Sequence, residues 1–235
     1  EYMGPAWYQR EIEIPAAWKG KRIFLYFERT HWLSSVYVGK EEVSKIDYIS
    51  IPHNHELTQW LHPGKKELIT FCIDNRYQYD THKWDHAHSE FTQINWNGVL
   101  GEIKLVAVDP VYVDDMQVYP DIKNKSIKVK MTVRNCTEHT ASGKISFHVT
   151  GKDYRLQKEV PVTVTDSITY IEEEMFLGKD IHLWNEFHPN LYTLDCKLTS
   201  SVEGQSYAHE KSTTFGMREV EAGEDHIILN GEPLH

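Results

Sequence analysis

The residues best suited to chemistry gather in one polar, aromatic stretch between residues 75 and 97. Among its members are Tyr77, Tyr79, Trp84, Trp96, Asn75, Gln93, Asn95, Asn97, Asp80 and Asp85. A sugar presents an apolar C–H face and a rim of hydroxyls, so a sugar site combines a flat aromatic ring with fixed amides and charges. The stretch therefore predicts contact with a carbohydrate.

Closely spaced histidines in and near this stretch raise the question of a metal site. They are His53 and His55, His86 and His88, and a further ring at His82. Each pair shares one face if its segment is extended. A zinc site, however, needs three or four converging ligands with supporting hydrogen bonds, which spacing alone does not indicate. Asp80 and Asp85 offer oxygen ligands to calcium or sodium, but we assign no metal and no cofactor from the sequence.

The composition excludes several classes of partner. The chain has 35 acidic and 25 basic residues and a formal net charge of −10, whereas nucleic-acid affinity depends on clustered Lys and Arg, so no nucleic-acid partner is expected. The longest uninterrupted apolar run, residues 23–27, has five residues, and a membrane-spanning helix needs about 20. No G-x-G-x-x-G, P-loop or G-x-S-x-G segment supports nucleotide or hydrolase-elbow chemistry.

The elements that must position these residues are β-strands. Apolar and polar residues alternate with a period of two along the chain, and helical periodicity almost never occurs. The predicted fold class is all-β, with strands near 8–14, 22–28, 35–39, 67–74, 98–108, 111–118, 127–135, 144–150, 158–164, 168–176, 191–199 and 207–215. Closely spaced strands in the second half are typical of an immunoglobulin-like sandwich, whereas a loop as long as 75–97 is usually functional.

Local signals divide the chain further. Asp109-Pro110 marks the predicted domain boundary, because proline interrupts a central ladder. Residues 227–234 predict a strand, a type I′ turn at Asn230-Gly231 and the start of a second strand. The chain opens at Glu1 without a methionine or a leader and ends in this hairpin, so we expect a piece of a longer protein. The odd number of cysteines, Cys72, Cys136 and Cys196, predicts free thiols.

Several motifs follow one another in an order that carries a family resemblance. They are Gly4-Pro5-Ala6-Trp7-Tyr8-Gln9-Arg10, Gly20-Lys21-Arg22, Val36-Tyr37-Val38-Gly39-Lys40, Ile73-Asp74-Asn75, Asn95-Trp96-Asn97-Gly98-Val99-Leu100-Gly101, Phe215-Gly216-Met217-Arg218 and Leu229-Asn230-Gly231-Glu232-Pro233. Together they resemble the non-catalytic front half of family 2 glycoside hydrolases, the group of the β-galactosidases, β-glucuronidases and β-mannosidases. The resemblance implies a sugar-binding jelly roll over 1–109, an immunoglobulin-like β-sandwich over 110–217, and over 218–235 the truncated start of a (β/α)₈ barrel that is absent.

The resemblance also implies where the chemistry lies. In this family the barrel carries the two glutamates of retaining hydrolysis, so the parent enzyme would hydrolyse terminal β-galactosides or β-glucuronides, and this segment would hold no catalytic residue. Loops of the family's first domain reach the sugar, and the matching rim positions are Gln93, Asn95, Trp96 and Asn97, together with Trp84, His86 and His88. The alternative is structural loop closure, with Trp96 as a core plug and Asn95 as a turn former.

The implied partners are a β-linked carbohydrate, through the parent enzyme, and the chain's own C-terminal barrel. A homo-oligomer of the parent stays open, as does the sugar, because the glycine-rich segment 98–101 lacks the arginine that many members have. The resemblance implies a bacterial periplasmic or secreted protein, or else a cytoplasmic one. Two other functions stay open: a free-standing carbohydrate-binding module that uses Trp84 and Trp96, and a structural two-sandwich adhesion piece.

The remaining tryptophans are predicted to be structural. Trp7 and Trp32 alternate with apolar strand residues and are expected in the core, whereas Trp18 would cover a sheet edge. Trp184 resembles a core residue of the second sandwich. The Asn185-Glu186 pair that follows imitates the Asn-Glu pair of the family's acid/base, but its place in that sandwich argues against catalysis.

Overall fold

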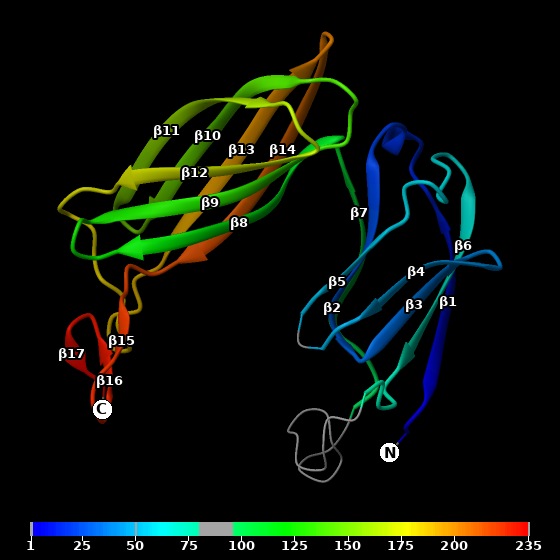
Figure 1. Ribbon diagram of the computed structural model, residues 1–235, viewed down its shortest axis with the longest axis horizontal. Helices are drawn as coiled ribbons and strands as arrows, with labels where there is room; N and C mark the ends of the chain where they lie inside the picture. Colours follow the sequence, from blue (N-terminus) through cyan, green and yellow to red (C-terminus); the bar gives the residue numbers. More distant parts are fainter. Residues whose placement is uncertain (1, 50, 80–95, 235) are drawn as a thin grey trace. The chain divides into compact units, whose positions relative to one another are not determined.

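The protein folds into β-sheets in two compact units. The computed structural model describes residues 2–49, 51–79 and 96–234, and these contain strands and one short 3₁₀ helix, η1 (Ala16–Trp18), but no α-helix (Figure 1). The units are Glu1–Val108 and Asp109–His235. The all-β class predicted from the period-two alternation is confirmed.

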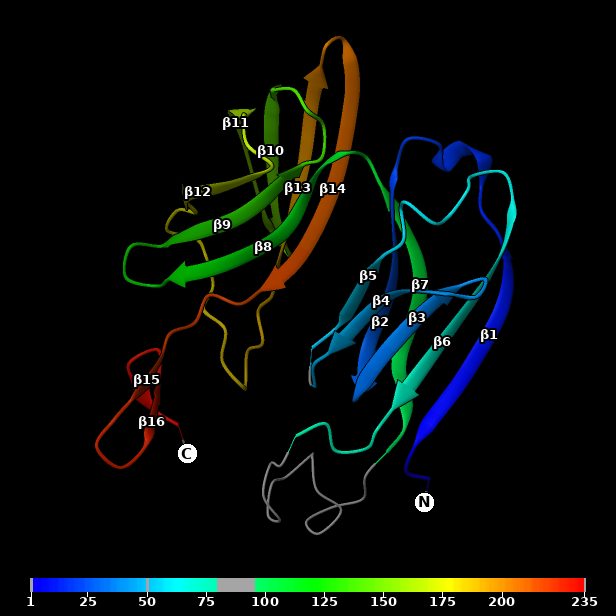
Figure 2. The ribbon, with the colours of Figure 1, turned by 45° about the vertical axis from the view of Figure 1, so that its right-hand side comes forward.

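The first unit is a sandwich of two antiparallel sheets (Figures 1 and 2). Its strands are β1 (Pro5–Glu13), β2 (Arg22–His31), β3 (Leu33–Val38), β4 (Glu41–Asp47), β5 (His53–Glu56), β6 (Lys66–Asp74) and β7 (Gly98–Val108). One sheet has the order β1-β6-β3-β4 and the other the order β5-β2-β7. This arrangement agrees with the predicted jelly-roll β-sandwich.

Alternation along the strands builds the core of the first unit. Ile23, Leu25 and Phe27 of β2 point inward and meet Val36 and Ile73 from the opposite sheet. Each fully buried side chain of this size stabilises the fold by about 1.5–3 kcal/mol. The core thus fixes the two sheets from which the loop at residues 75–97 leaves and returns.

Two strands of the first unit were not picked out by the sequence pattern. They are β4, which is rich in charged residues, and β5, whose sequence is His53-Asn54-His55-Glu56. Neither shows the apolar alternation expected of a half-buried strand. In β5 the inward positions are instead held by His53 and His55, which are both fully buried.

The second unit contains a seven-stranded sandwich of the immunoglobulin-like kind. Its strands are β8 (Val111–Asp121), β9 (Ser126–Asn135), β10 (Ala141–Gly151), β11 (Tyr154–Val164), β12 (Ile168–Phe176), β13 (Tyr192–Val202) and β14 (Gln205–Phe215). They form the sheets β11-β10-β13-β14 and β12-β9-β8. Between them lies a core of apolar side chains that includes Ile127, Phe147 and Leu198, each fully buried.

Side chains also close one side of this sandwich, where β8 and β14 are the edge strands. The backbone N–H of Val113 donates to Nδ1 of His209 at 3.2 Å, and that of Ala208 donates to Asp109 at 2.9 Å. Beside this seam the β8–β9 register shifts between Val113 and Asp115. Such bonds cover strand edges that would otherwise offer unpaired backbone groups.

A small sheet follows the sandwich, built from β15 (Val220–Ala222), β16 (Ile227–Leu229) and β17 (Glu232–Pro233). The predicted type I′ turn is confirmed, because Asn230 and Gly231 have φ of 54° and 86° and lie between paired strands. Strand β15 was not predicted. Asn230 also donates from Nδ2 to the carbonyl of Trp184 at 2.9 Å, which ties the turn to the sandwich.

The three cysteines are free thiols, as predicted. Cys72 and Cys196 are buried, and Cys136 is exposed. Burial raises the pKa of Cys196 to about 12, with Lys211 opposing this. A buried, protonated thiol of this kind is inert, so Cys196 acts as a small core residue.

Candidate functional site

The candidate site lies at the end of β6 and just before the start of β7, on the described residues that flank 80–95. Of the predicted rim residues, Trp96 and Asn97 belong to the described part of the chain. The others lie outside the described residues: Gln93, Asn95, Trp84, His86 and His88. The same holds for His82, Asp80 and Asp85.

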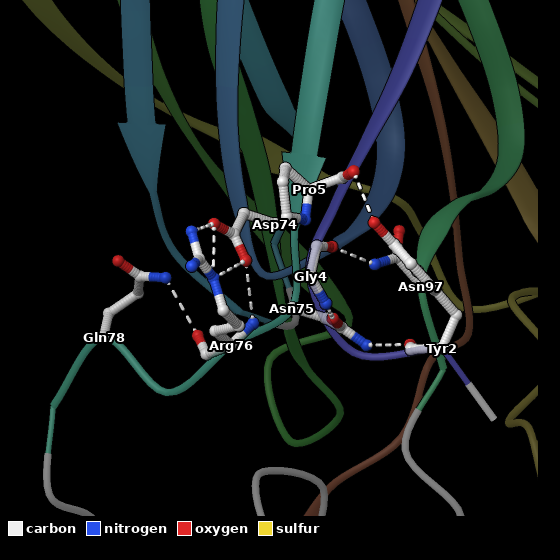
Figure 3. A network of polar contacts seen from close by, with 8 residues as sticks. All are labelled: Tyr2, Gly4, Pro5, Asp74, Asn75, Arg76, Gln78 and Asn97. Carbon is white, nitrogen blue, oxygen red and sulfur yellow. Dashed lines mark hydrogen bonds and ion pairs between the residues drawn. The ribbon is translucent and has the colours of Figure 1, made fainter.

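Asn75 is the centre of a hydrogen-bond network at the base of this loop (Figure 3). Its side chain is fully buried. Oδ1 accepts the backbone N–H of Gly4 at 2.9 Å, and Nδ2 donates to the carbonyls of Tyr2 and Trp96, both at 3.1 Å. One amide therefore joins the end of β6, the N-terminal segment and the residue that begins the return to β7.

Asn97 completes the link on the returning side. Its Nδ2 donates to the carbonyl of Gly4 at 2.7 Å, so Gly4 is held from both sides by asparagine amides (Figure 3). Gly4 has a φ of 142°, which a residue with a side chain rarely adopts. Oδ1 of Asn97 is buried and has no hydrogen-bond partner among the residues that the structure describes. An acceptor in this state is suited to a hydroxyl donor.

A carboxylate lies beside the amides. Asp74, at the end of β6, is 7% exposed and accepts hydrogen bonds from Nε of Arg76 and from its backbone N–H, each at 3.0 Å. These bonds from Arg76 lower the pKa of Asp74 although burial acts in the opposite direction. Asp74 is therefore ionised at neutral pH and holds the guanidinium of Arg76 at the exposed edge of the site (Figure 3).

Aromatic rings form the apolar part of the site. The ring of Trp96 lies 5.0 Å from that of His31, and Trp32 lies 6.3 Å from Tyr79. His31 and Trp32 are buried, whereas Tyr79 is 64% exposed. The hydroxyl of Tyr79 donates to Oδ2 of Asp47 at 2.6 Å, which raises the pKa of the phenol. Flat rings next to amides and carboxylates can bind a sugar face and its hydroxyls.

The metal question has a partial answer. Within the ranges 2–49, 51–79 and 96–234, no group of three or more His, Cys, Asp or Glu side chains could hold a metal ion. His53 and His55 share one strand face, as expected, but both bind the hydroxyl of Ser34. The pair is thus a hydrogen-bonded core element.

Of the two tryptophans expected in the core of the first unit, one is buried and the other is not. Trp7 was expected in the core and is 59% exposed, because it lies on the outer face of β1 and contacts the ring of Tyr37 at 5.5 Å. Trp32 is buried, as predicted. Trp18 packs against the first core, and Trp184 is half-buried beneath the guanidinium of Arg218.

The Asn185-Glu186 pair has a local structural role. Oδ1 of Asn185 accepts the backbone N–H groups of Phe187 and His188, at 3.0 and 2.6 Å, and so shapes the turn. Glu186 is exposed. The absence of a catalytic role for this pair stays a prediction.

Sequence reasoning did not identify three contributors to the site. Asn75 was noted only as a polar residue of the stretch, and neither His31 nor Asp47 was considered. The signal available for Asn75 was its place directly after the apolar end of β6, where an amide can satisfy the backbone groups that a strand leaves unpaired. His31 and Asp47 carry no comparable signal, since only strand pairing brings them near the loop.

The fold and the site together define an all-β, two-sandwich protein with an aromatic and amide cluster at one loop. Residues 111–218 match the model of the glycosyl hydrolases family 2. This match confirms the resemblance carried by the motifs. The matches across the whole chain are consistent with an N-terminal region of a family 2 enzyme.

Relatives align with the full length of the chain. It is 23% identical over 237 residues to the β-galactosidase of Thermoanaerobacter pseudethanolicus, covering 100% of this chain and 31% of that protein. It is 22% identical over 264 residues to the β-glucuronidase of Sus scrofa, covering 100% and 38%. The chain thus spans less than half the length of these curated relatives.

Solved structures share the fold. A crystal structure of Bacteroides uniformis β-glucuronidase superimposes with a TM-score of 0.80 at 18% identity, covering 99% of this chain and 29% of that one. A family 2 member from Bacteroides cellulosilyticus gives a TM-score of 0.76 at 19% identity, covering 98% and 29%. No helix in the described residues is long and apolar enough to cross a membrane.

Proposed function

We propose that this chain is the non-catalytic front part of a family 2 glycoside hydrolase. In the parent, 1–109 would be the sugar-binding jelly roll, 110–217 the immunoglobulin-like spacer and 218–235 the start of the catalytic barrel. The parent would hydrolyse terminal β-galactosides or β-glucuronides with retention of configuration. The family match, the names of the relatives and the share of their length that aligns support this proposal.

Within that enzyme, the first unit would shape the rim of the sugar site and brace the barrel. The observation that carries this role is the cluster at the base of the 75–97 loop. There the ring of Trp96 lies 5.0 Å from that of His31, and Oδ1 of the next residue, Asn97, lacks a partner in the described part of the chain. In this role a sugar hydroxyl would donate to that oxygen, and the indole ring would contact the sugar's C–H face.

Incubation of the purified 235-residue chain with aryl β-galactosides and aryl β-glucuronides tests the non-catalytic role. We expect no turnover, because the two glutamates of retaining hydrolysis belong to the barrel. Turnover by the purified chain would overturn the proposal. The reading frame after His235 supplies a second test, since a barrel with two glutamates supports the parent assignment and a stop codon contradicts it.

A free-standing carbohydrate-binding module is the second candidate, favoured by the exposed ring of Tyr79 beside Trp32. Calorimetry with β-linked oligosaccharides separates the two. Binding by the isolated chain that disappears in Trp96→Ala and persists in Trp7→Ala would favour the module. Absence of binding by the folded chain favours the front part of an enzyme, whose sugar site is complete only with the barrel. A structural adhesion piece would show neither binding nor a downstream barrel.

A further inference from the structure

Two fully buried histidines of the first unit meet at one hydroxyl group. His53 and His55 both point inward from β5, and both are 0% exposed. Oγ of Ser34, on β3, lies 2.6 Å from Nδ1 of His53 and 2.8 Å from Nε2 of His55. The outer ring nitrogens also have partners, since Nε2 of His53 lies 3.1 Å from the carbonyl of Tyr48 and Nδ1 of His55 lies 2.8 Å from Oγ of Ser44.

These four hydrogen bonds form a series from Tyr48 through His53, Ser34 and His55 to Ser44. The Tyr48 carbonyl sets the direction of every hydrogen bond in this series. A carbonyl only accepts, so Nε2 of His53 carries a hydrogen and, in the neutral ring, Nδ1 is an acceptor. Ser34 must therefore donate its single hydrogen to His53, which leaves its oxygen to accept from Nε2 of His55. Nδ1 of His55 then accepts from the hydroxyl of Ser44. All four ring nitrogens are satisfied only in this order.

We infer that this chain of hydrogen bonds is a reversible proton switch, in which uptake of one proton charges His53 and changes the tautomer of His55. Ser44 is only half-buried and can receive the proton from water. Its own hydrogen passes to Nδ1 of His55, the Nε2 hydrogen of His55 passes to Ser34, and the hydrogen of Ser34 passes to Nδ1 of His53. Each hydroxyl loses one hydrogen and gains one, and His53 becomes the imidazolium.

The reversed chain keeps every hydrogen bond. His53 then donates to both Tyr48 and Ser34, Ser34 donates to Nε2 of His55, and Nδ1 of His55 donates to Ser44. A second proton, which would also charge His55, is disfavoured. Ser34 would then face two N–H donors, and its own hydrogen would lack an acceptor. The switch therefore holds one proton.

The surroundings favour His53 as the place of the charge. Burial lowers the pKa of His53, but the hydrogen bond to the Tyr48 carbonyl and, to a smaller extent, Asp47 at the end of β4 oppose this. For His55, burial and repulsion from His53 lower the pKa to about 3. The elements packed against His55 contribute the ring of Phe27 from β2, at 5.3 Å, and the hydroxyls of Ser34 and Ser44 from β3 and β4. In the described residues, Asp47 is the one charged group that acts on the pair.

The switch lies beneath the candidate site. Asp47 accepts the hydroxyl of Tyr79, and Tyr48, the next residue, provides the carbonyl that orients His53. A charge on His53 therefore acts on the carboxylate that holds an aromatic ring of the site. Acidification would reach Tyr79 through Asp47 without unfolding the sandwich.

Imidazole nitrogen NMR on the ¹⁵N-histidine-labelled chain tests the switch directly, with signals assigned through backbone connectivity. At pH 7.5 we expect both rings as the Nε2–H tautomer. On acidification His53 should become doubly protonated while His55 changes to the Nδ1–H tautomer, at one shared midpoint.

Three outcomes would overturn the switch. In the first, His55 keeps its Nε2–H tautomer when His53 is charged. In the second, both rings become charged together. In the third, the protein unfolds before either ring changes. In Ser44→Ala the tautomer change of His55 should be lost, because its new Nδ1–H has no acceptor. The matched variant Ser35→Ala alters a neighbouring serine on the other face of β3 and should leave the change intact.

Discussion

The two units fill their interiors with different kinds of side chains. Among the described residues, the first unit buries twelve apolar side chains and eight polar ones, whereas the second buries twenty-five and three. Burying a polar group costs free energy unless it is hydrogen-bonded. The first unit meets this cost with networks around Asn75 and Ser34, close to the candidate site. The second relies on apolar packing.

The largest effect should come from the apolar interior of the second unit. Phe147→Ala removes a fully buried ring and should lower the free energy of unfolding by about 3–5 kcal/mol. Urea unfolding combined with peptide-resolved hydrogen exchange over 141–151 measures this loss. The exposed residue Phe187 provides the control, because Phe187→Ala should change stability by less than about 0.5 kcal/mol. If Phe147→Ala lowered the free energy of unfolding no more than Phe187→Ala does, the second unit would not depend on its apolar interior.

An intermediate effect is expected at Asn75. Asn75→Ala leaves the N–H of Gly4 and the carbonyls of Tyr2 and Trp96 without their partner, at a cost of about 2–4 kcal/mol. Hydrogen exchange of the Gly4 amide should become at least about tenfold faster, since an exchange barrier lowered by 1.4 kcal/mol already gives that factor.

Asn135 is the matched residue in the second unit. It is 3% exposed and bonds mainly to its own neighbours, such as Thr137 and His139. Asn135→Ala should therefore loosen one turn and leave the Gly4 amide unaffected. Equal exchange at Gly4 in both variants would mean that Asn75 does not join the segments as described.

The smallest change in the free energy of unfolding, counted for each pH unit, should appear on acidification. The pKa of His55 is lowered to about 3, whereas the unfolded chain binds a proton near the ordinary value of about 6.5. Unfolding below pH 6.5 therefore takes up a proton, and stability falls by about 1.4 kcal/mol for each pH unit between 6.5 and 3. The difference in urea stability between the natural chain and His55→Gln should shrink with this slope. A difference that stays constant between pH 6.5 and 3 would show that His55 does not contribute.

Periodicity predicted most of the fold because most strands here are half-buried. Strands such as β9 alternate apolar and charged residues, and one face of each must meet the core. The same logic failed for β4, which is mostly charged or polar although Val43 packs against the core, and for β5, whose inward positions are histidines. It also failed for Trp7, where alternation could not tell the inner face from the outer one. Which face of an edge strand is covered depends on the partner sheet, which no local pattern encodes.

Sequence reasoning singled out two residues of the candidate site but not the contacts that join its parts. Trp96 and Asn97 follow from residue type and from the family's motif. The roles of Asn75 and Asp47 depend on residues far apart in sequence, such as Gly4 and Tyr79. Their side chains meet only after the strands have paired, so a reading of one stretch at a time could not find them.

The link made by Asn75 bears on how such proteins diversify. With the N-terminal segment and Trp96 tied to one buried amide, the sandwich does not depend on the length of chain between residues 79 and 96. The position of Trp96 is thus fixed by the sandwich itself. Substitutions between residues 80 and 95 should therefore leave this scaffold in place.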